Sequence, residues 1–282
     1  MILFKRKADL RAYLSALKQE RQSIGFVPTM GALHEGHVSL IESSRRDNSI
    51  TVCSIFVNPT QFNDPNDFKK YPVTLEKDIY KLELAGCNVL FLPTVEEIYP
   101  DGTDSLKKYD LGYLETILEG QYRPGHFQGV CLVVDRLLDM VKPDNLYLGQ
   151  KDYQQCMVIT KMIGLAGHSS VIVKICPTLR EPDGLAMSSR NIRLNKDERQ
   201  KAPVIYQSLS HIKENLLKGD LTMLKEQALT TLRNNGFRPD YLETADAGTL
   251  QLVNKWDGKQ KLVALTAAFL NDVRLIDNLV LN

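Results

Sequence analysis

Two histidines that flank a glycine, in His34-Glu35-Gly36-His37, make up the segment of this sequence best suited to chemistry. The segment follows an apolar run at 24–28 that predicts a strand, and we expect a helix to begin near Gly36. A helix start offers open backbone N–H groups and partial positive charge, and glycine lets the backbone approach an anion closely. Imidazole N–H groups add donors for charge that develops on a leaving pyrophosphate. The segment therefore predicts a polyphosphate site.

Zinc is the sharpest alternative for this pair. Metalloprotease helices carry histidines at i and i+4 in the pattern HExxH, whereas His34 and His37 are three residues apart, and the sequence shows no third ligand cluster. Two solvated loop histidines are the plainer alternative. Their place directly after a predicted strand favours phosphate. Neither GxGxxG nor a P-loop occurs, which disfavours a Rossmann dehydrogenase and a P-loop kinase.

Three further loops carry polar side chains just after predicted strands or at the end of the sheet region. Lys151 would be a point charge for phosphate, and Asp152 would cap the next helix. Ser188 and Arg190 end a polar loop and could donate hydrogen bonds to phosphate oxygens. Segment 56–62 follows another strand. Each loop alone is ordinary, but polar loops at one edge of a parallel sheet predict a ligand site.

Apolar runs alternate with amphipathic stretches over the first two-thirds of the chain. This rhythm predicts an α/β fold, a Rossmann-like doubly wound parallel sheet. We expect strands at 24–28, 49–57, 89–93, 146–149 and 171–175, and helices at 75–85, 130–141 and 152–165. The rhythm breaks after residue 176, so the sequence predicts a Rossmann-like domain over 1–176 and a smaller C-terminal α+β domain over 177–282. The second domain should contain helices at 196–217 and 221–234 and strands at 241–247, 261–269 and 273–281.

Composition narrows the class of protein. The 282 residues include 35 lysines and arginines against 34 acidic residues, so no global field attracts nucleic acid or an anionic membrane. The apolar run at 262–270 is too short to span a bilayer. The basic cluster at 5–7 follows the first apolar residues instead of preceding a hydrophobic stretch, so we expect no secretory signal. An odd number of cysteines without a CxxC pair predicts free thiols in a reducing cytoplasm. They are Cys53, Cys87, Cys131, Cys156 and Cys176.

Five segments together resemble the pantoate–β-alanine ligase (pantothenate synthetase) family, part of the HIGH-motif nucleotidylyltransferase superfamily that includes class I aminoacyl-tRNA synthetases. They are PTMGALHEGH at 28–37, IFVNPTQF at 55–62, RPGHFQGV at 123–130, LGQKDYQQ at 148–155 and REPDGLAMSSRN at 180–191. The Met-Ser-Ser-Arg stretch stands where synthetases carry a KMSKS loop, with Arg190 supplying the charge. The resemblance spans nearly the whole chain.

The resemblance implies an ATP-dependent ligase that condenses (R)-pantoate with β-alanine through a pantoyl adenylate and releases AMP and pyrophosphate. It also implies a magnesium requirement, a cytoplasmic homodimer and a place in the synthesis of pantothenate and coenzyme A. The domain over 1–176 would bind the nucleotide and pantoate, and the domain over 177–282 would be a lid.

The resemblance also implies roles for single residues. His34, His37, Lys151 and Arg190 would be catalytic, with His37 the general acid/base candidate. ATP would contact Met30, His34, His37, Gly149, Lys151, Asp152, Leu179, Met187, Ser188, Ser189 and Arg190. Pantoate would contact Pro28, Met30, Gln61 and Gln155.

Two other functions remain open on the sequence. Another HIGH-motif nucleotidylyltransferase would release a dinucleotide-like product instead of AMP. A non-catalytic module would bind ATP without pyrophosphate exchange. The sequence assigns no magnesium ligands and no β-alanine subsite.

Overall fold

The chain forms two compact units in a computed structural model that describes residues 1–63, 68–103 and 107–282. The first unit contains residues 1–150 and 155–177, and the second contains 151–154 and 178–282. Lys151–Gln154 thus belongs to the C-terminal unit although the chain on either side of it belongs to the first. Within the described residues no helix is long and apolar enough to cross a membrane.

A six-stranded parallel sheet in the order β1-β4-β3-β2-β5-β6 forms the centre of the first unit. Its strands are Ile2–Phe4, Ile24–Thr29, Ile50–Ile55, Val89–Phe91, Asn145–Gly149 and Ile172–Cys176, for β1 to β6. The predicted doubly wound sheet is confirmed, and β1 is an additional edge strand next to β4. Because all strands run the same way, the loops after β2, β3 and β5 leave the sheet at one edge.

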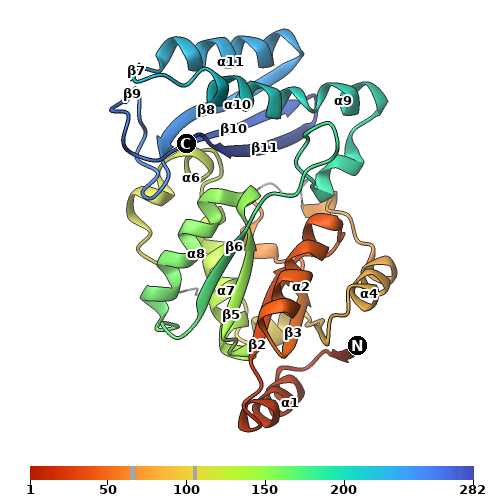
Figure 1. Cartoon of the computed structure of the whole chain (residues 1–282). Helices are drawn as coiled ribbons and strands as arrows, with labels where there is room; N and C mark the ends of the chain where they lie inside the picture. The colour runs from red at the N-terminus through yellow and green to blue at the C-terminus, as the bar shows by residue number, and fades with distance from the viewer. Residues whose placement is uncertain (64–67, 104–106) are drawn as a thin grey trace. The chain divides into compact units, whose positions relative to one another are not determined.

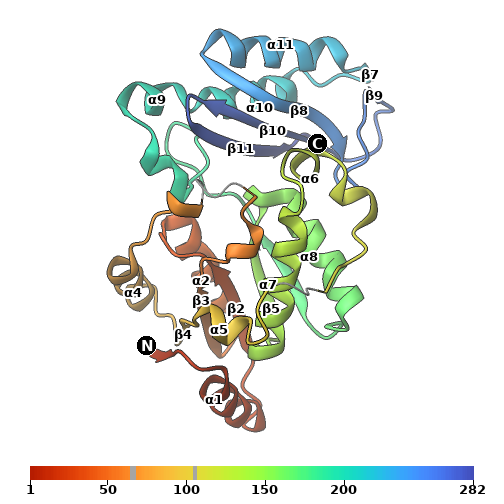
Figure 2. The same cartoon turned by 180° about the vertical axis from the view of Figure 1, so that it is seen from behind.

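Helices cover both faces of this sheet (Figures 1 and 2). The helices α1, α7 and α8 share one hydrophobic cluster, and α2 and α4 pack in another with the opposite side chains of β2 and β3. Their bounds are α1 Lys7–Gln19, α2 Glu35–Asp47, α4 Leu75–Leu84, α5 Val95–Ile98, α6 Leu118–Tyr122, α7 His126–Val141 and α8 Tyr153–Ala166. Helix α7 begins one turn before the predicted residue 130, so it brings the RPGH segment onto a helix start.

An antiparallel sheet in the order β11-β10-β8 forms the second unit and confirms the predicted small sheet. The strands are β8 Phe237–Asp246, β10 Leu262–Leu270 and β11 Val273–Val280, and β7 Gly219–Asp220 pairs with β9 Lys255–Trp256. Helices α10 Val204–Glu214 and α11 Thr222–Asn234 pack on the three-stranded sheet. Figure 1 shows them above it, over the blue strands.

The prediction of one helix over 196–217 is wrong. The chain forms α9 Lys196–Lys201 and then α10 Val204–Glu214, with Pro203 between them. Proline lacks a backbone N–H and its ring crowds the preceding turn, so the first helix ends before it. The five cysteines are free, as predicted, and all but Cys176 are buried.

Candidate active site

The two histidines cap helix α2 reciprocally. His34 is the N-cap residue, and its ring Nδ1 accepts the backbone N–H of Gly36 at 3.2 Å. The backbone N–H of His34 donates to Nδ1 of His37 at 3.3 Å, and the ring centroids lie 4.1 Å apart. A ring nitrogen that accepts is unprotonated, so each neutral imidazole carries its proton on Nε2. The cap therefore fixes the tautomer of both rings.

This geometry corrects one expectation about the helix start. The sequence predicts open backbone N–H groups at this helix start, but in the structure the N–H of Gly36 donates to the His34 ring. The imidazoles thus take up backbone donors at the start of α2 and carry Nε2–H groups in their place. Because a protonated Nδ1 could no longer accept, the capped form of each ring is the neutral one.

A tight turn before the cap is held by a buried carboxylate. Gly31 and Ala32 have φ angles of 82° and 49°, the left-handed region that costs a non-glycine residue energy. Asp78 lies on helix α4 and is only 1% exposed. Its carboxylate accepts hydrogen bonds from the backbone N–H groups of Ala32 at 2.9 Å and of Leu33 at 2.8 Å. The Lys81 ammonium, one turn later, donates to the Leu33 carbonyl at 2.9 Å. Helix α4 thereby fixes the backbone that leads into His34.

The side chain of Gln61 lies after β3 in the short helix η1, Pro59–Gln61. The residue is 9% exposed, so its side chain is largely shielded from solvent although it lies in a loop region. Its Oε1 accepts from Asn58 Nδ2 at 3.2 Å, and its Nε2 lies 3.0 Å from the Met30 sulfur. The structure thus brings together Met30 and Gln61, two of the residues assigned to pantoate.

Asn58 is the centre of the hydrogen-bond network that sets this amide. Its Oδ1 accepts the Tyr99 hydroxyl at 2.7 Å, and its Nδ2 also donates to the carbonyl of Gly129 on α7 at 3.1 Å. Burial raises the pKa of Tyr99, which keeps the phenol a donor. A Cβ on Gly129 would lie 2.2 Å from the Thr60 carbonyl oxygen, so only glycine allows α7 this close to η1.

His126, the N-terminal residue of α7, holds the other side of the same loop. Its Nδ1 lies 2.8 Å from the carbonyl oxygen of Gln61, which can only accept, so this ring carries its proton on Nδ1. Nε2 lies 3.1 Å from the Arg123 guanidinium, which can only donate. The residue is 5% exposed. His126 therefore has the opposite tautomer to His34 and His37.

The second unit carries the cationic residues. Lys151 lies in the short helix η3, Gln150–Asp152, and its Nζ is 3.4 Å from the Asp152 carboxylate. Asp152 thus pairs with Lys151 in this structure, directly before α8 begins at Tyr153. The Lys151 side chain is 16% exposed.

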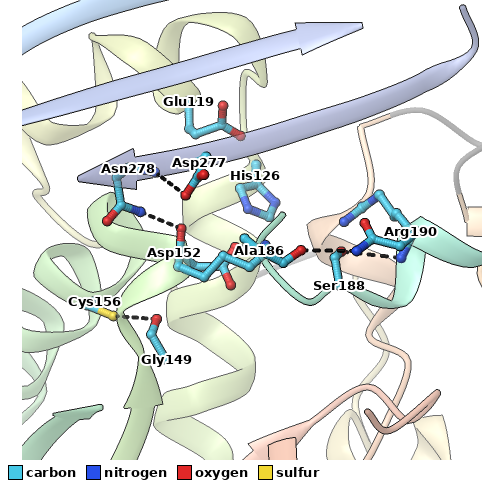
Figure 3. Close-up of polar contacts among 12 residues, drawn as sticks. Glu119, His126, Gly149, Asp152, Cys156, Ala186, Ser188, Arg190, Asp277 and Asn278 are labelled. Carbon is cyan, nitrogen blue, oxygen red and sulfur yellow. Dashed lines mark hydrogen bonds and ion pairs between the residues drawn. The ribbon is translucent and has the colours of Figure 1, made fainter. Parts of the chain in front are cut away.

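Ser188 is the N-cap of the short helix η4, Ser189–Arg193, where its Oγ accepts the backbone N–H of Arg190 at 3.3 Å (Figure 3). The residues before it form a small hairpin, in which Met187 N–H donates to the Leu179 carbonyl at 3.0 Å. Asn191 Nδ2 donates a hydrogen bond to the Ala186 carbonyl at 3.0 Å and so ties the hairpin to η4. The cap leaves the phosphate role expected for Ser188 possible, because one hydroxyl can accept and donate together.

The predicted site residues divide between the two units. The first unit contains Pro28, Met30, His34, His37, Gln61, Gly149 and Gln155, and the second contains Lys151, Asp152, Leu179, Met187, Ser188, Ser189 and Arg190. Gly149 ends β5, where its carbonyl accepts the Cys156 thiol at 3.3 Å (Figure 3). Gln155 is half-buried in the first turn of α8.

One cluster in the described residues has the composition of a metal site, namely Asp135, Asp139 and His168. Asp135 accepts from the Tyr109 hydroxyl at 2.5 Å, His168 Nε2 at 2.6 Å and Lys107 at 3.0 Å. Burial raises the pKa of Asp135, but these hydrogen bonds outweigh it and lower the pKa overall. Asp135 also lies about 13 Å along α7 from His126, the residue that contacts Gln61, at roughly 1.5 Å per residue, so the cluster is away from the loop that carries Gln61. We interpret the cluster as a structural ion pair.

The family model described as Pantoate-beta-alanine ligase matches residues 2–280. The chain belongs to the pantoate–β-alanine ligase family. Pantothenate synthetase from Cytophaga hutchinsonii is 44% identical, covering 97% of this chain and 96% of its own. The crystal structure of pantothenate synthetase from Thermus thermophilus superposes with a TM-score of 0.90 at 42% identity, covering 99% of both chains.

A pantoate–β-alanine ligase from Francisella tularensis, in a structure described as complexed with "Beta-gamma ATP and Beta-alanine", is 38% identical with a TM-score of 0.83. It covers 99% of this chain and 97% of its own. The predicted resemblance and fold are thereby confirmed.

Three positioning residues in this ligase-family chain were missed by sequence reasoning. Asn58 and His126 lie inside the segments 55–62 and 123–130, so the motif quoted them without revealing their hydrogen bonds. Asp78 lies in a helix without a motif, and no local signal connects it to Ala32, 46 residues away. An aspartate on the buried stripe of an amphipathic helix is the signal that could have drawn attention to it, because buried carboxylates are rare unless paired.

Asp78→Asn is expected to slow pantoate-dependent ATP–pyrophosphate exchange while changing the pantoate KM little. The amide keeps the shape but offers one acceptor oxygen, so one N–H of the turn loses its partner. Losing a hydrogen bond to a charged group should also lower the free energy of unfolding by about 1.5–3 kcal/mol. Steady-state kinetics and urea unfolding measure both effects.

Thr74→Val is the matched control. It removes only the threonine hydroxyl that donates to the same carboxylate at 3.1 Å and leaves both turn N–H bonds intact. Equal exchange rates in the two variants would contradict the role assigned to Asp78.

Proposed function

We propose that this protein condenses (R)-pantoate with β-alanine, using ATP, to form pantothenate, AMP and pyrophosphate, the reaction that supplies pantothenate for coenzyme A. The observation that carries the proposal is the reciprocal histidine cap at the start of α2, in a chain that belongs to the pantoate–β-alanine ligase family. Two imidazoles with Nε2–H groups at a helix start, after a parallel strand, suit the phosphates of a nucleotide.

The reaction divides into two displacements. A pantoate carboxylate oxygen attacks the α-phosphorus of ATP, a P–O bond forms and the bond to pyrophosphate breaks. The β-alanine amine then attacks the acyl carbon, a C–N bond forms, the C–O bond to AMP breaks and the amine loses a proton. Forming the adenylate converts a poor acyl donor into a good one, so one hard step becomes two easier ones.

The first unit would bind pantoate and part of the phosphate chain. The Nε2–H groups of His34 and His37 donate to phosphate oxygens as negative charge builds on the leaving pyrophosphate. Gln61 Nε2, oriented by Asn58, donates to a pantoate hydroxyl or carboxylate oxygen. The remaining pantoate contacts would be Pro28, Met30 and Gln155. Neutral amides suit this task, since an arginine clamp would withdraw the electron density that the attacking carboxylate needs.

The second unit would neutralise the departing pyrophosphate. Lys151 contributes a point charge, and Arg190 and Ser188 donate charge-assisted or neutral hydrogen bonds. The other residues proposed to contact the nucleotide are Met30, Gly149, Asp152, Leu179, Met187 and Ser189. His37 is the general acid/base candidate in this proposal, with proton transfer at Nε2 because Nδ1 holds the cap.

Magnesium would enter with ATP, as the MgATP complex, and not as a resident ion of the protein. Mg²⁺ prefers hard oxygen ligands in octahedral geometry. The residues proposed for the phosphates are imidazoles, a lysine and an arginine, which are donors to anions and do not suit this ion. The carboxylate of Asp152 is engaged with Lys151.

We also propose that the ligase is a cytoplasmic homodimer that associates through its first unit. Free thiols agree with a reducing compartment. Strand β6 is at the edge of the parallel sheet, and its Ile172 and Ile175 are 58% and 50% exposed. Exposed apolar side chains on an edge strand are a site for association. Light scattering should give twice the 31.9 kDa chain mass, and a monomer at micromolar concentration would contradict the dimer.

Radiolabelled pyrophosphate exchange into ATP tests the function. We expect exchange with pantoate and magnesium in the absence of β-alanine, and AMP release only when β-alanine is added. Exchange that required β-alanine would exclude a free adenylate intermediate. A dinucleotide-like product would indicate another HIGH-motif nucleotidylyltransferase, and ATP binding without exchange would indicate a non-catalytic module.

A further inference from the structure

Strand β11 of the second unit carries two adjacent buried polar residues, Asp277 and Asn278, each 2% exposed. Asn278 Nδ2 donates to the backbone carbonyl of Lys151 at 2.8 Å. The two residues are 127 positions apart in the sequence, and the short stretch 151–154 belongs to the second unit. Tyr153 donates its hydroxyl to the Ala247 carbonyl at 2.7 Å, a second tie between this stretch and the C-terminal unit.

Asp277 holds the loop that leads to Arg190. Its two carboxylate oxygens accept hydrogen bonds from the Arg180 guanidinium at 2.7 and 2.9 Å, so the two residues form a bidentate pair. The Asp277 side chain is fully buried. The same guanidinium donates to the Asn278 carbonyl at 3.1 Å and lies 4.0 Å from the Tyr206 ring centroid. Hydrogen bonds therefore hold the edge of the Arg180 guanidinium, and the Tyr206 ring packs against its face.

The loop beyond Arg180 is a closed hairpin. Arg180 pairs with Ala186, and its guanidinium donates to the Gly184 carbonyl at 3.1 Å. Ser188 and Arg190 follow directly after this hairpin. Fixing Arg180 on β11 thus fixes the base of the loop whose end carries the proposed phosphate-binding groups.

We propose that Asp277 and Asn278 are positioning residues for adenylation, which hold Lys151 and the base of the Arg190 loop on one rigid strand. The inference rests on the proposed role of Lys151 and Arg190 in binding the leaving pyrophosphate. A common element that contacts both segments helps to keep two cations on separate loops at a constant spacing. β11 supplies that element, since it pairs along its whole length with β10 in the centre of the small sheet.

A double-mutant cycle between Asn278→Ala and Lys151→Ala tests the proposal by pyrophosphate exchange. Lys151→Ala should lower the exchange rate about 10²–10³-fold, as for loss of one preorganised donor. Asn278→Ala should lower it by up to about 10²-fold with the pantoate KM unchanged, as for a misplaced catalytic group. In the Lys151→Ala background the same substitution should cost less than about 2-fold, because the two effects share one lysine.

Asn282→Ala is the matched control. Its amide also donates to a backbone carbonyl, that of Gln260 at 3.1 Å, at the edge of the same sheet. We expect exchange in this variant to equal wild type. Asn278→Asp, which keeps the side-chain shape but cannot donate to the Lys151 carbonyl, should repeat the loss seen with alanine.

The possible negative results separate the proposed function, the role of Lys151 and the positioning role of Asn278. Absence of exchange in wild type would refute the proposed function, and an unaffected Lys151→Ala would refute the role of the lysine. An active Asn278→Ala beside an impaired Lys151→Ala would overturn the positioning role alone. So would equal losses in both backgrounds, or failure of both Asn278 variants to fold, since either result makes the residue purely structural.

Discussion

One imidazole nitrogen cannot accept a backbone N–H and hold a proton at the same time, and the proposed catalysis depends on this constraint. At the start of α2 it applies twice, at Nδ1 of His34 and of His37. The helix start thereby fixes which ring nitrogen carries hydrogen, and it makes Nε2–H the donor of both rings. A single hydrogen bond of this kind contributes little to stability, but it decides whether the ring donates or accepts toward a phosphate.

The rest of the first unit supports these side chains through buried polar contacts. Asp78 holds the strained turn before His34, and Asn58 sets the amide of Gln61. Asp78 belongs to α4, and Asn58 is itself bonded to the carbonyl of Gly129 on α7, so both loops at the sheet edge are tied to helices that pack in the hydrophobic core. A loop residue positioned this way is available to a ligand at little further entropy cost, which is the usual arrangement for a preorganised site.

How much of this could be predicted depended on the range of the interaction. The parallel sheet, most helices and the edge where the motifs gather followed from local patterns such as the alternation before residue 176. Pro203 was also a local signal, for the end of one helix and the start of the next, but the segment 196–217 was nevertheless predicted as one helix. The reciprocal cap lies within four residues, yet the sequence alone does not tell whether Gly36 donates to an anion or to an imidazole. Contacts between distant residues could not be predicted, because Asp78 meets Ala32, and Asn278 meets Lys151, only once the chain has folded. The sequence analysis assigned no role to Asp277 or Asn278 for this reason.

The tautomers of the histidines test the central claim most directly. Nitrogen NMR of the ¹⁵N-histidine-labelled protein at neutral pH, assigned with His34→Gln and His37→Gln, distinguishes a protonated from an unprotonated ring nitrogen. The account predicts Nε2–H rings for His34 and His37 and the opposite, Nδ1–H ring for His126, which provides a contrast within the same sample. Nδ1–H or doubly protonated rings at His34 and His37 would contradict it.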